Sequence, residues 1–368
     1  MSIQKPKFSR DNNDFSNSLR TNVNNYFKTT KISKNANANM VIKTITMLLM
    51  YFGPLILMLT GIITNPWVIF GCWIMMGFGM AGIGMNIMHD SVHGSYSKNK
   101  MMNTFLGYSM NVIGANANMW QIQHNQLHHG FTNIDEVDMD IAPPNAILRF
   151  SPNQKRNWIH QFQHFYVWFF YSISTLIWVT SKDFTQVFKF RRVGVITEDK
   201  QLKKELRQII FWKLFYFSYI LVLPLLLVPV SPWLIILGFI TLHAITGFSL
   251  SIVFQTAHVM PDNIWPLPDK DGKMENNWAV HQMLTTSNFS PKSRIFSWFI
   301  GGLNYQIEHH LFANICHVHY RAISKIVVKT AEEHGIPYRT QQNFILALVN
   351  HYKMLRYLGK VEYVAVKS

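Results

Sequence analysis

Three short clusters contain seven of the sixteen histidines in the sequence. The first cluster reads HDSVH and begins at His89, the second reads HNQLHH and begins at His124, and the third reads QIEHH and begins at Gln306. Two side chains four residues apart share one face of a helix, so His89 could bind one metal ion together with His93. The clusters therefore predict metal chemistry.

The second cluster repeats this spacing between His124 and His128. The neighbouring His129 and the adjacent pair His309 and His310 point in other directions, and they could reach a second ion. One ion does not use seven imidazoles, so the pattern favours a shared site with two metal ions.

Neutral imidazole suits iron, zinc or copper. Cys72 and Cys316 are the two cysteines and lie far apart in the sequence, which argues against a disulfide framework, a CxxC motif and an iron–sulfur cluster. The clusters also hold too few carboxylates for a ferritin-like site. The two that they do hold, Asp90 and Glu308, could orient imidazole N–H groups or be solvated charges.

The composition indicates a lipid environment, since 49% of the residues are hydrophobic and 14% are charged. Two long runs, 44–88 and 214–257, contain no charged residue, and each is interrupted by a Pro beside a Trp. Each half is close to the ~20 residues that cross a bilayer. The predicted fold class is an all-α integral membrane protein with four transmembrane helices in two hairpins, at about 44–63, 67–88, 211–229 and 233–256.

A third uncharged run, 157–181, is rich in aromatic residues and contains His160 and His164. Metal–nitrogen bonds are about 2 Å long, so the clusters must meet on one side of a hydrocarbon core about 30 Å thick. The chain then crosses an even number of times between clusters, and this run is predicted to be an interfacial helix at about 158–180. The clusters would form a histidine-rich cap. His243, inside the last predicted span, either has a hydrogen-bonded structural role or lines a substrate channel.

Lys and Arg outnumber Asp and Glu by 34 to 19, which gives a net charge of +15. The two turns within the predicted hairpins carry none of the basic residues, so the positive-inside tendency places both termini and the histidine clusters on the cytoplasmic side. This orientation accounts for the charge, and nucleic-acid binding is not expected. Residues 1–40 are polar, basic and without a signal-peptide core, so they are predicted to be a mobile N-terminal arm before a membrane domain at 41–368.

The series HDSVHG, HNQLHH and QIEHH, separated by paired apolar runs, resembles the membrane-bound fatty acid desaturases. The Gln that opens the third cluster is similar to the front-end branch of that family, which acts on acyl-lipids or acyl-CoA. The resemblance runs from about Tyr26 to Tyr338, with Ala313 in place of the usual Pro. It also includes Trp120, the Thr132-Asn133 pair, Gln255 to His258, and Trp278 with Gln282.

This resemblance implies a di-iron centre that activates O2 and removes two hydrogens from a fatty acyl chain. Gln306 stands where other desaturase branches have a histidine, so it could be a ligand, a donor beside the ligands or a spacer. Asp90 and Glu308 are candidates for supporting the ligands. Carried over by position, the implied iron ligands are eight histidines: His89, His93, His124, His128, His129, His258, His309 and His310.

The resemblance also implies the partners. The substrate would be a fatty acyl chain linked to CoA, to a carrier protein or to a membrane lipid, and the carbon attacked is left open. Many front-end relatives carry a fused cytochrome b5 domain with an HPGG motif, which this sequence lacks. A separate electron donor is therefore expected, either ferredoxin or cytochrome b5 with its reductase.

Other functions are compatible with these residues. The same metal centre could hydroxylate a lipid or an alkane, because the ligands fix the oxidant whereas the substrate tunnel fixes the product. A histidine-rich metal transporter is the non-enzymatic alternative, although transporters place polar groups near the membrane midplane and only His243 qualifies. An intramembrane metalloprotease is disfavoured because HDSVH has Asp90 where HExxH has Glu, and one zinc would leave two clusters unused.

Overall fold

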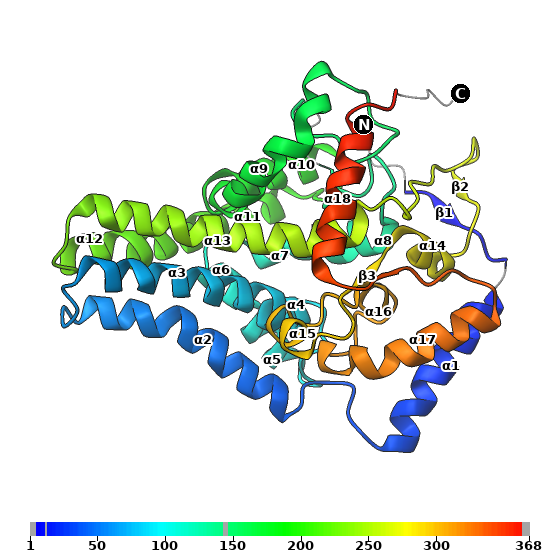
Figure 1. The fold of residues 1–368 in the computed structure, drawn as a ribbon, viewed down its shortest axis with the longest axis horizontal. Helices are drawn as coiled ribbons and strands as arrows, with labels where there is room; N and C mark the ends of the chain where they lie inside the picture. The colour runs from blue at the N-terminus through cyan, green and yellow to red at the C-terminus, as the bar shows by residue number, and fades with distance from the viewer. Residues whose placement is uncertain (1–4, 12, 143–145, 363–368) are drawn as a thin grey trace. The chain divides into compact units, whose positions relative to one another are not determined.

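The fold is that of a computed structural model, which describes residues 5–11, 13–142 and 146–362. The described chain is mostly helical (Figure 1), as the sequence predicts. Four of the described helices are long and apolar enough to cross a membrane, at 38–59, 66–92, 199–227 and 232–258. Their number agrees with the four predicted spans. Their pairing into two hairpins and the histidine-rich cap stay predictions.

Two of these four helices begin earlier than the uncharged runs suggest. The first is α2 (Ala38–Leu59), where the Asn37 side chain accepts a hydrogen bond from a backbone N–H of the first turn. The third begins with the charged first turns of α11 (Asp199–Phe217) and continues through η5 (Ser218–Val222) and α12 (Leu223–Leu227). Because a helix can extend past the hydrocarbon into water, the loss of charge marks the bilayer boundary and not the helix end.

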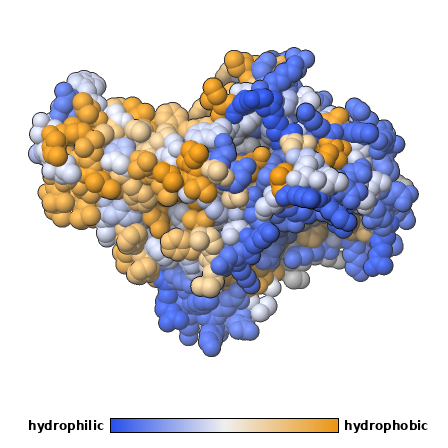
Figure 2. Space-filling model, turned by 90° about the horizontal axis from the view of Figure 1, so that it is seen from below, coloured by the Kyte–Doolittle hydropathy of each residue, from blue (hydrophilic) through white to orange (hydrophobic). Residues whose placement is uncertain are grey.

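The other two helices begin at prolines. The second consists of α3 (Pro66–Gly82), the π-helical segment η1 (Ile83–Met88) and α4 (His89–Val92), and the fourth is α13 (Pro232–His258). Proline suits a first helical position because the N–H that it lacks would have no partner there. Figure 2 shows hydrophobic side chains gathered over part of the surface, and the exposed residues of these helices include Trp67 and Trp233. Such exposure suits contact with lipid.

The chain divides into two compact units that interleave along the sequence. Among the described residues, unit 1 contains 37–120 and 168–252, and unit 2 contains those of 5–36, 121–167 and 253–362. The first histidine cluster belongs to unit 1, whereas the second and third clusters belong to unit 2. The predicted division into 1–40 and 41–368 follows composition and stays a prediction.

Unit 1 is built from the long apolar helices and shorter connecting helices. The helices α2 and α3 approach closely, because a Cβ at Gly79 would lie 2.7 Å from the backbone N of Tyr51. The shorter elements are α5 (Lys100–Gly107), α6 (Ser109–Val112), most of α7 (Ala117–Gln121), η4 (Trp178–Lys182) and α10 (Asp183–Arg192).

Polar side chains inside unit 1 bond to one another. His243, within α13, has its Nε2 2.9 Å from the Tyr216 hydroxyl and its Nδ1 3.2 Å from the Thr175 Oγ1. Both ring nitrogens therefore have partners, which supports the hydrogen-bonded structural role. The hydroxyls of Tyr51 and Tyr219, 2.8 Å apart, make a second polar contact between helices.

Lys213 is a buried cation of α11. Its Nζ donates to the carbonyls of Gly114, Trp178 and Val179 at 3.2, 2.9 and 3.0 Å, and to Asp183 Oδ2 at 2.8 Å. Two of these carbonyls belong to the widened π-helical turn η4. Taking a charge out of water is costly unless it is paired and hydrogen-bonded, and these four acceptors meet that requirement.

Lys213→Met is expected to lower the thermal unfolding midpoint in detergent, because it leaves the Asp183 carboxylate buried without its cation. Removing one partner of a buried pair costs about 3–5 kcal/mol. The double variant Lys213→Met/Asp183→Asn should recover part of that loss. Thermal unfolding of both single variants and the double variant measures the coupling, and losses that simply add would contradict it.

The first helix of unit 2, α1 (Asn13–Thr30), is packed against the rest of that unit. It packs with α17 (Tyr320–Glu333) in one hydrophobic cluster. The expectation of a mobile arm is therefore wrong for this segment. The apolar face is hard to see in the sequence because Asn, Ser and Thr separate its members. The buried side chains of α1 lie four residues apart: Phe15, Leu19, Val23 and Phe27.

Two short parallel strand pairs were not predicted by the all-α assignment. β1 (Lys7–Phe8) pairs with β2 (Lys273–Met274), and β3 (Asn288–Phe289) pairs with β4 (Thr340–Gln341). Strands of two residues are too short to produce an alternating pattern. Further elements of unit 2 are η2 (Ile122–His128), α8 (His129–Phe131), α14 (Trp278–Thr285), α15 (Arg294–Phe299), α16 (Gln306–Leu311), η6 (His317–His319) and α18 (Phe344–Leu358).

The predicted interfacial segment is helical. It consists of η3 (Trp158–Phe162), α9 (Gln163–Ile177) and η4, and it is not one of the four candidate spans found among the described residues. His160 completes the first turn, because its Nδ1 accepts a hydrogen bond from the Asn157 N–H at 3.0 Å. The position of this segment at the bilayer surface stays a prediction.

Candidate metal centre

The second cluster lies on an unusual helical turn. His124 and His128 belong to the π-helical segment η2, which continues into α8 at His129. The ring centroids of His124 and His128 are 5.2 Å apart, so the two side chains lie side by side. Single π-helical turns inside α-helices are frequent at functional sites because they redirect side chains. The sequence pattern predicted the pairing but not the widened turn.

Three buried histidines of unit 2 form one group. His128 comes from η2, His258 from the end of α13 and His310 from α16, and one nitrogen of each lies within 4.8 Å of the other two. The Nε2 of His128 is buried and has no hydrogen-bond partner. A buried ring nitrogen without a hydrogen-bond partner is costly. Three nitrogens at these distances could bind one metal ion through bonds of about 2 Å.

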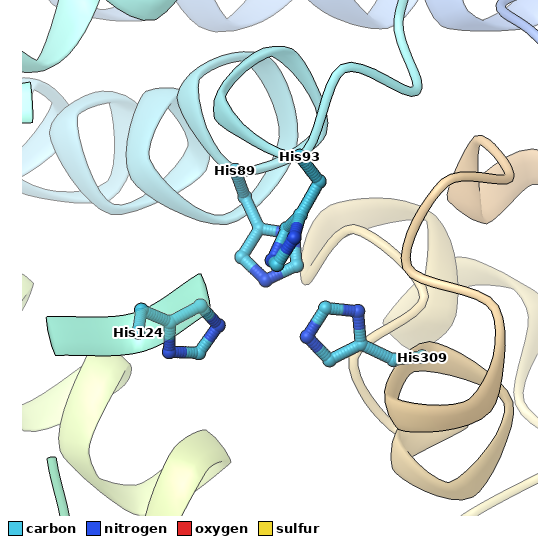
Figure 3. A group of neighbouring side chains, drawn as sticks. All are labelled: His89, His93, His124 and His309. Carbon is cyan, nitrogen blue, oxygen red and sulfur yellow. The ribbon is translucent and has the colours of Figure 1, made fainter. Parts of the chain in front are cut away.

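A second group in unit 2 joins the second and third clusters. The Nε2 of His129 lies 3.2 Å from the Nε2 of His124 and 2.9 Å from that of His309. Figure 3 shows His124 and His309 pointing toward one another, and their rings are nearly parallel, with centroids 5.8 Å apart. Ring nitrogens this close either share a proton or bind a common ion.

The first cluster keeps its predicted pairing within unit 1. His89 and His93 lie on one helix, where η1 passes into α4, and Figure 3 shows both side chains on the same side of it. Their ring centroids are 4.8 Å apart. Trp120 contacts both rings, with centroid distances of 5.8 Å to His89 and 6.0 Å to His93. An apolar surface therefore adjoins these two imidazoles.

Two carboxylates orient the second cluster. Asp138 Oδ2 lies 2.9 Å from His128 Nδ1, and Asp140 Oδ2 lies 2.6 Å from His124 Nδ1. A carboxylate that binds Nδ1–H leaves Nε2 for a metal and makes it a better donor. Nothing in the sequence distinguishes these carboxylates from the neighbouring acidic residues, and the one available signal is their spacing of two residues in the loop after the cluster.

The charge around His128 favours its protonated form when no metal is bound. Burial alone would lower the pKa of His128, but the carboxylates of Asp138 and Asp140 overcome this and raise the pKa above its ordinary value. A divalent cation would therefore meet two anionic carboxylates behind the imidazole ligands.

The third cluster is held by an amide. His310 Nδ1 donates to Gln282 Oε1 at 2.8 Å, and the same oxygen accepts a hydrogen bond from Thr132 Oγ1 at 2.8 Å. Gln282 Nε2 donates in turn to the His129 carbonyl at 3.2 Å. The amide therefore joins the second and third clusters. His309 Nδ1 lies 3.3 Å from the Tyr320 hydroxyl.

The predicted supporting residues lie close to the histidines. Asp90 Oδ1 is 3.6 Å from His89 Nδ1, which is too long for a direct hydrogen bond. Glu308 is buried and accepts hydrogen bonds from Asn288 Nδ2 at 2.8 Å and from the Tyr338 hydroxyl at 2.9 Å. Burial raises the pKa of Glu308 to about 7. Gln306 is buried in the first turn of α16, and the supporting roles of Asp90, Gln306 and Glu308 stay predictions.

Comparison with known proteins identifies the family. The family described as fatty acid desaturase matches residues 64–342. The acyl-lipid (8-3)-desaturase of Physcomitrium patens is 35% identical over 357 residues, which cover 96% of this chain and 73% of that protein. The sn-1 linoleoyl-lipid 6-desaturase of Arthrospira platensis is 33% identical over 350 residues, which cover 93% of this chain and 92% of that protein.

The chain therefore belongs to the fatty acid desaturase family. It is an oxidoreductase that introduces a double bond into a fatty acyl chain, and it is an integral membrane protein. The family generally uses a di-iron centre and O2. The resemblance seen in the sequence is confirmed, and the hydroxylase and transporter alternatives have no support from these relatives.

Asp138→Asn is expected to weaken iron binding 10- to 100-fold, roughly the cost of losing a carboxylate behind a histidine ligand. The measurement is iron per polypeptide, by mass spectrometry of the metal, after equilibration with a series of ferrous iron concentrations. Glu136→Gln is the matched control, because Glu136 lies in the same loop but is exposed. Equal iron binding by both variants would contradict the role of Asp138.

Proposed function

We propose that this desaturase uses two iron ions, held by the eight histidines, to insert a double bond between an existing double bond and the carboxyl end of a lipid-linked acyl chain. The observation that carries the proposal is the convergence of six buried histidines in unit 2, with carboxylates bonded to two of them. Structural histidines usually pair with backbone or solvent, whereas imidazoles backed by carboxylates are typical of metal ligands.

The eight histidines divide into two ligand sets in this proposal. His128, His258 and His310 bind one ion, since one nitrogen of each lies within 4.8 Å of the others. The proposal assigns the second ion to His124 and His309 of unit 2 together with the first-cluster pair, His89 and His93, as the resemblance to the family implies. The eighth histidine, His129, adjoins both ligand sets. Its ring stacks on that of His310 with a centroid distance of 4.3 Å, and its Nε2 lies 2.9 Å from the Nε2 of His309.

Iron with O2 supplies an oxidant strong enough to take hydrogen from an unactivated methylene, which no side chain can do. The residues of the chain orient the ligands and exclude water. Phe254 contributes to the exclusion of water, because its ring lies 5.1 Å from the rings of both His128 and His258 and 6.3 Å from that of His124. Asp138 and Asp140 hold the Nδ1 protons of His128 and His124, which would leave each Nε2 free to bind a metal ion.

The relatives and the third cluster support the choice of substrate. The Physcomitrium patens protein is named an acyl-lipid (8-3)-desaturase and the Arthrospira platensis protein an sn-1 linoleoyl-lipid 6-desaturase. Both names describe desaturases that act on lipid-linked acyl chains. The third cluster of this chain opens with Gln306, as in the front-end branch that the sequence resembles.

The remaining partners follow from the reaction. Reduction of O2 to water while one double bond forms requires two electrons from outside the substrate, so the proposal includes a separate carrier, ferredoxin or cytochrome b5 with its reductase. The basic residues at the ends of the predicted spans support a cytoplasmic location for both termini and for the histidines, where such carriers are found.

Expression in a host that lacks front-end desaturation, fed with linoleate, is expected to yield a new trienoic acid in which the added double bond lies on the carboxyl side of the existing ones. Gas chromatography with mass spectrometry of the esterified lipids gives the position. His310→Ala should remove the product and lower the iron content, because its imidazole belongs to one ligand set. A hydroxylated product, or a double bond on the methyl side, would contradict the proposal.

His334→Ala is the matched control for this experiment. His334 is exposed at the end of α17, away from the three clusters in sequence. Its loss should leave both the product and the iron content unchanged. If His310→Ala retained two iron ions and full activity, the assignment of the ligands would be wrong.

A further inference from the structure

The last helix of unit 2, α18, has an exposed face with two different halves. Its first two turns expose Ile345, which is 74% exposed, and Val349, whereas its last turns expose Lys353 and Arg356. These four residues recur at intervals of three or four, so they follow one side of the helix. An exposed apolar stripe that ends in basic residues is typical of helices that lie in a membrane surface.

The opposite face of α18 is fixed, so this exposed face cannot turn inward. Arg149 is fully buried, and its Nη1 donates to the carbonyls of Leu358 at 2.6 Å and Val361 at 2.7 Å. A Cβ at Gly359 would overlap the His160 carbonyl oxygen, so the end of the helix packs directly against backbone. These contacts fix the rotation of α18 about its axis.

The height of α18 relative to the bilayer follows from a contact with a membrane span. His351 Nδ1 donates to the Val259 carbonyl at 2.9 Å, and Val259 is the residue directly after α13. With 27 residues, α13 is about 40 Å long and exceeds the hydrocarbon core of about 30 Å. Its ends therefore reach the polar surface of the bilayer, and α18 lies beside one of those ends.

Neighbouring elements of unit 2 extend the apolar half of this face. The ring of Phe344, at the start of α18, has its centroid 4.7 Å from that of Phe296 in α15. The neighbour of Phe296 in α15, Ile295, is 85% exposed. On the other flank, the exposed Phe165 of α9 lies 6.3 Å from the Tyr352 ring. Soluble proteins normally expose large apolar residues singly. Here such residues are exposed on three adjacent elements, which indicates an interaction surface.

We propose that this face of α18, with Ile295 and Phe165 beside it, is an interfacial docking surface for anionic phospholipid. Ile345 and Val349 enter the acyl-chain boundary, and Lys353 and Arg356 bind the phosphate groups above it. Charge complementarity selects anionic over zwitterionic lipid, because basic residues beside a membrane are attracted by its negative surface potential. The surface gives unit 2 its own attachment to the bilayer beside the end of α13.

A depth measurement tests the apolar half. The full chain carrying Ile345→Cys is labelled with a small fluorophore and placed in lipid nanodiscs that contain nitroxide-labelled phosphatidylcholine. The label at position 345 should lose most of its fluorescence, whereas a label at Lys325→Cys on the exposed face of α17 should lose little. Val349→Cys provides a second position should the first variant fold poorly. Labels at 345 and 349 that stay as bright as the one at 325 would place α18 in water or against a protein, and would overturn the proposal.

Hydrogen exchange tests the basic half. In nanodiscs of phosphatidylcholine with phosphatidylglycerol, the amides of 344–358 should exchange more slowly than in phosphatidylcholine alone. Each basic residue near an anionic surface strengthens binding about fivefold. Lys353→Gln/Arg356→Gln should therefore reduce the effect of phosphatidylglycerol by about 25-fold. The control double variant Arg321→Gln/Lys325→Gln on α17 removes the same number of positive charges and should leave the effect of phosphatidylglycerol intact. An equal loss in both double variants would refute a headgroup site on α18, and neither measurement depends on iron or on activity.

Discussion

The candidate centre depends on holding each imidazole with its Nδ1 protonated and its Nε2 turned inward. Asp138 does this for His128, and the neutral amide oxygen of Gln282 does it for His310. A carboxylate bonded to Nδ1–H makes the imidazole a stronger metal donor than an amide oxygen in the same place does. Among the histidines proposed to bind one ion, His128 is therefore expected to be a stronger donor than His310.

The groups that support the histidines are tied together by hydrogen bonds between three segments of unit 2. The Asn133 side chain donates to the carbonyls of His258, Ile264 and Thr285, and Asn263 donates to the carbonyls of His258 and Thr285. The loop after the second cluster, the end of α13 and the end of α14 are thus joined at common acceptors. Because buried amides without partners are costly, these segments keep one arrangement.

Sequence spacing predicted the histidines but not the residues that hold them. The four spans follow from uncharged runs, and the pairs at i and i+4 survive in the folded chain because a helix enforces that spacing locally. The bonds from Asp138 to His128 and from Gln282 to His310 span 10 and 28 residues. Loop conformation and tertiary packing set such distances, and no periodic pattern records them. The packed helix α1 escaped detection for another reason, since its polar residues hide a four-residue apolar repeat.

The position of α1 has a consequence for the order of assembly. Its apolar side packs with Ile307, Tyr320 and Val327, which leave the ribosome nearly three hundred residues later. During that interval the helix has no native partner, while the intervening spans enter the bilayer. The hydrophobic cluster that includes Ile307 of the third cluster is thus complete only when the earliest and latest parts of the chain meet. The proposed metal centre is accordingly complete only after the last helices have left the ribosome.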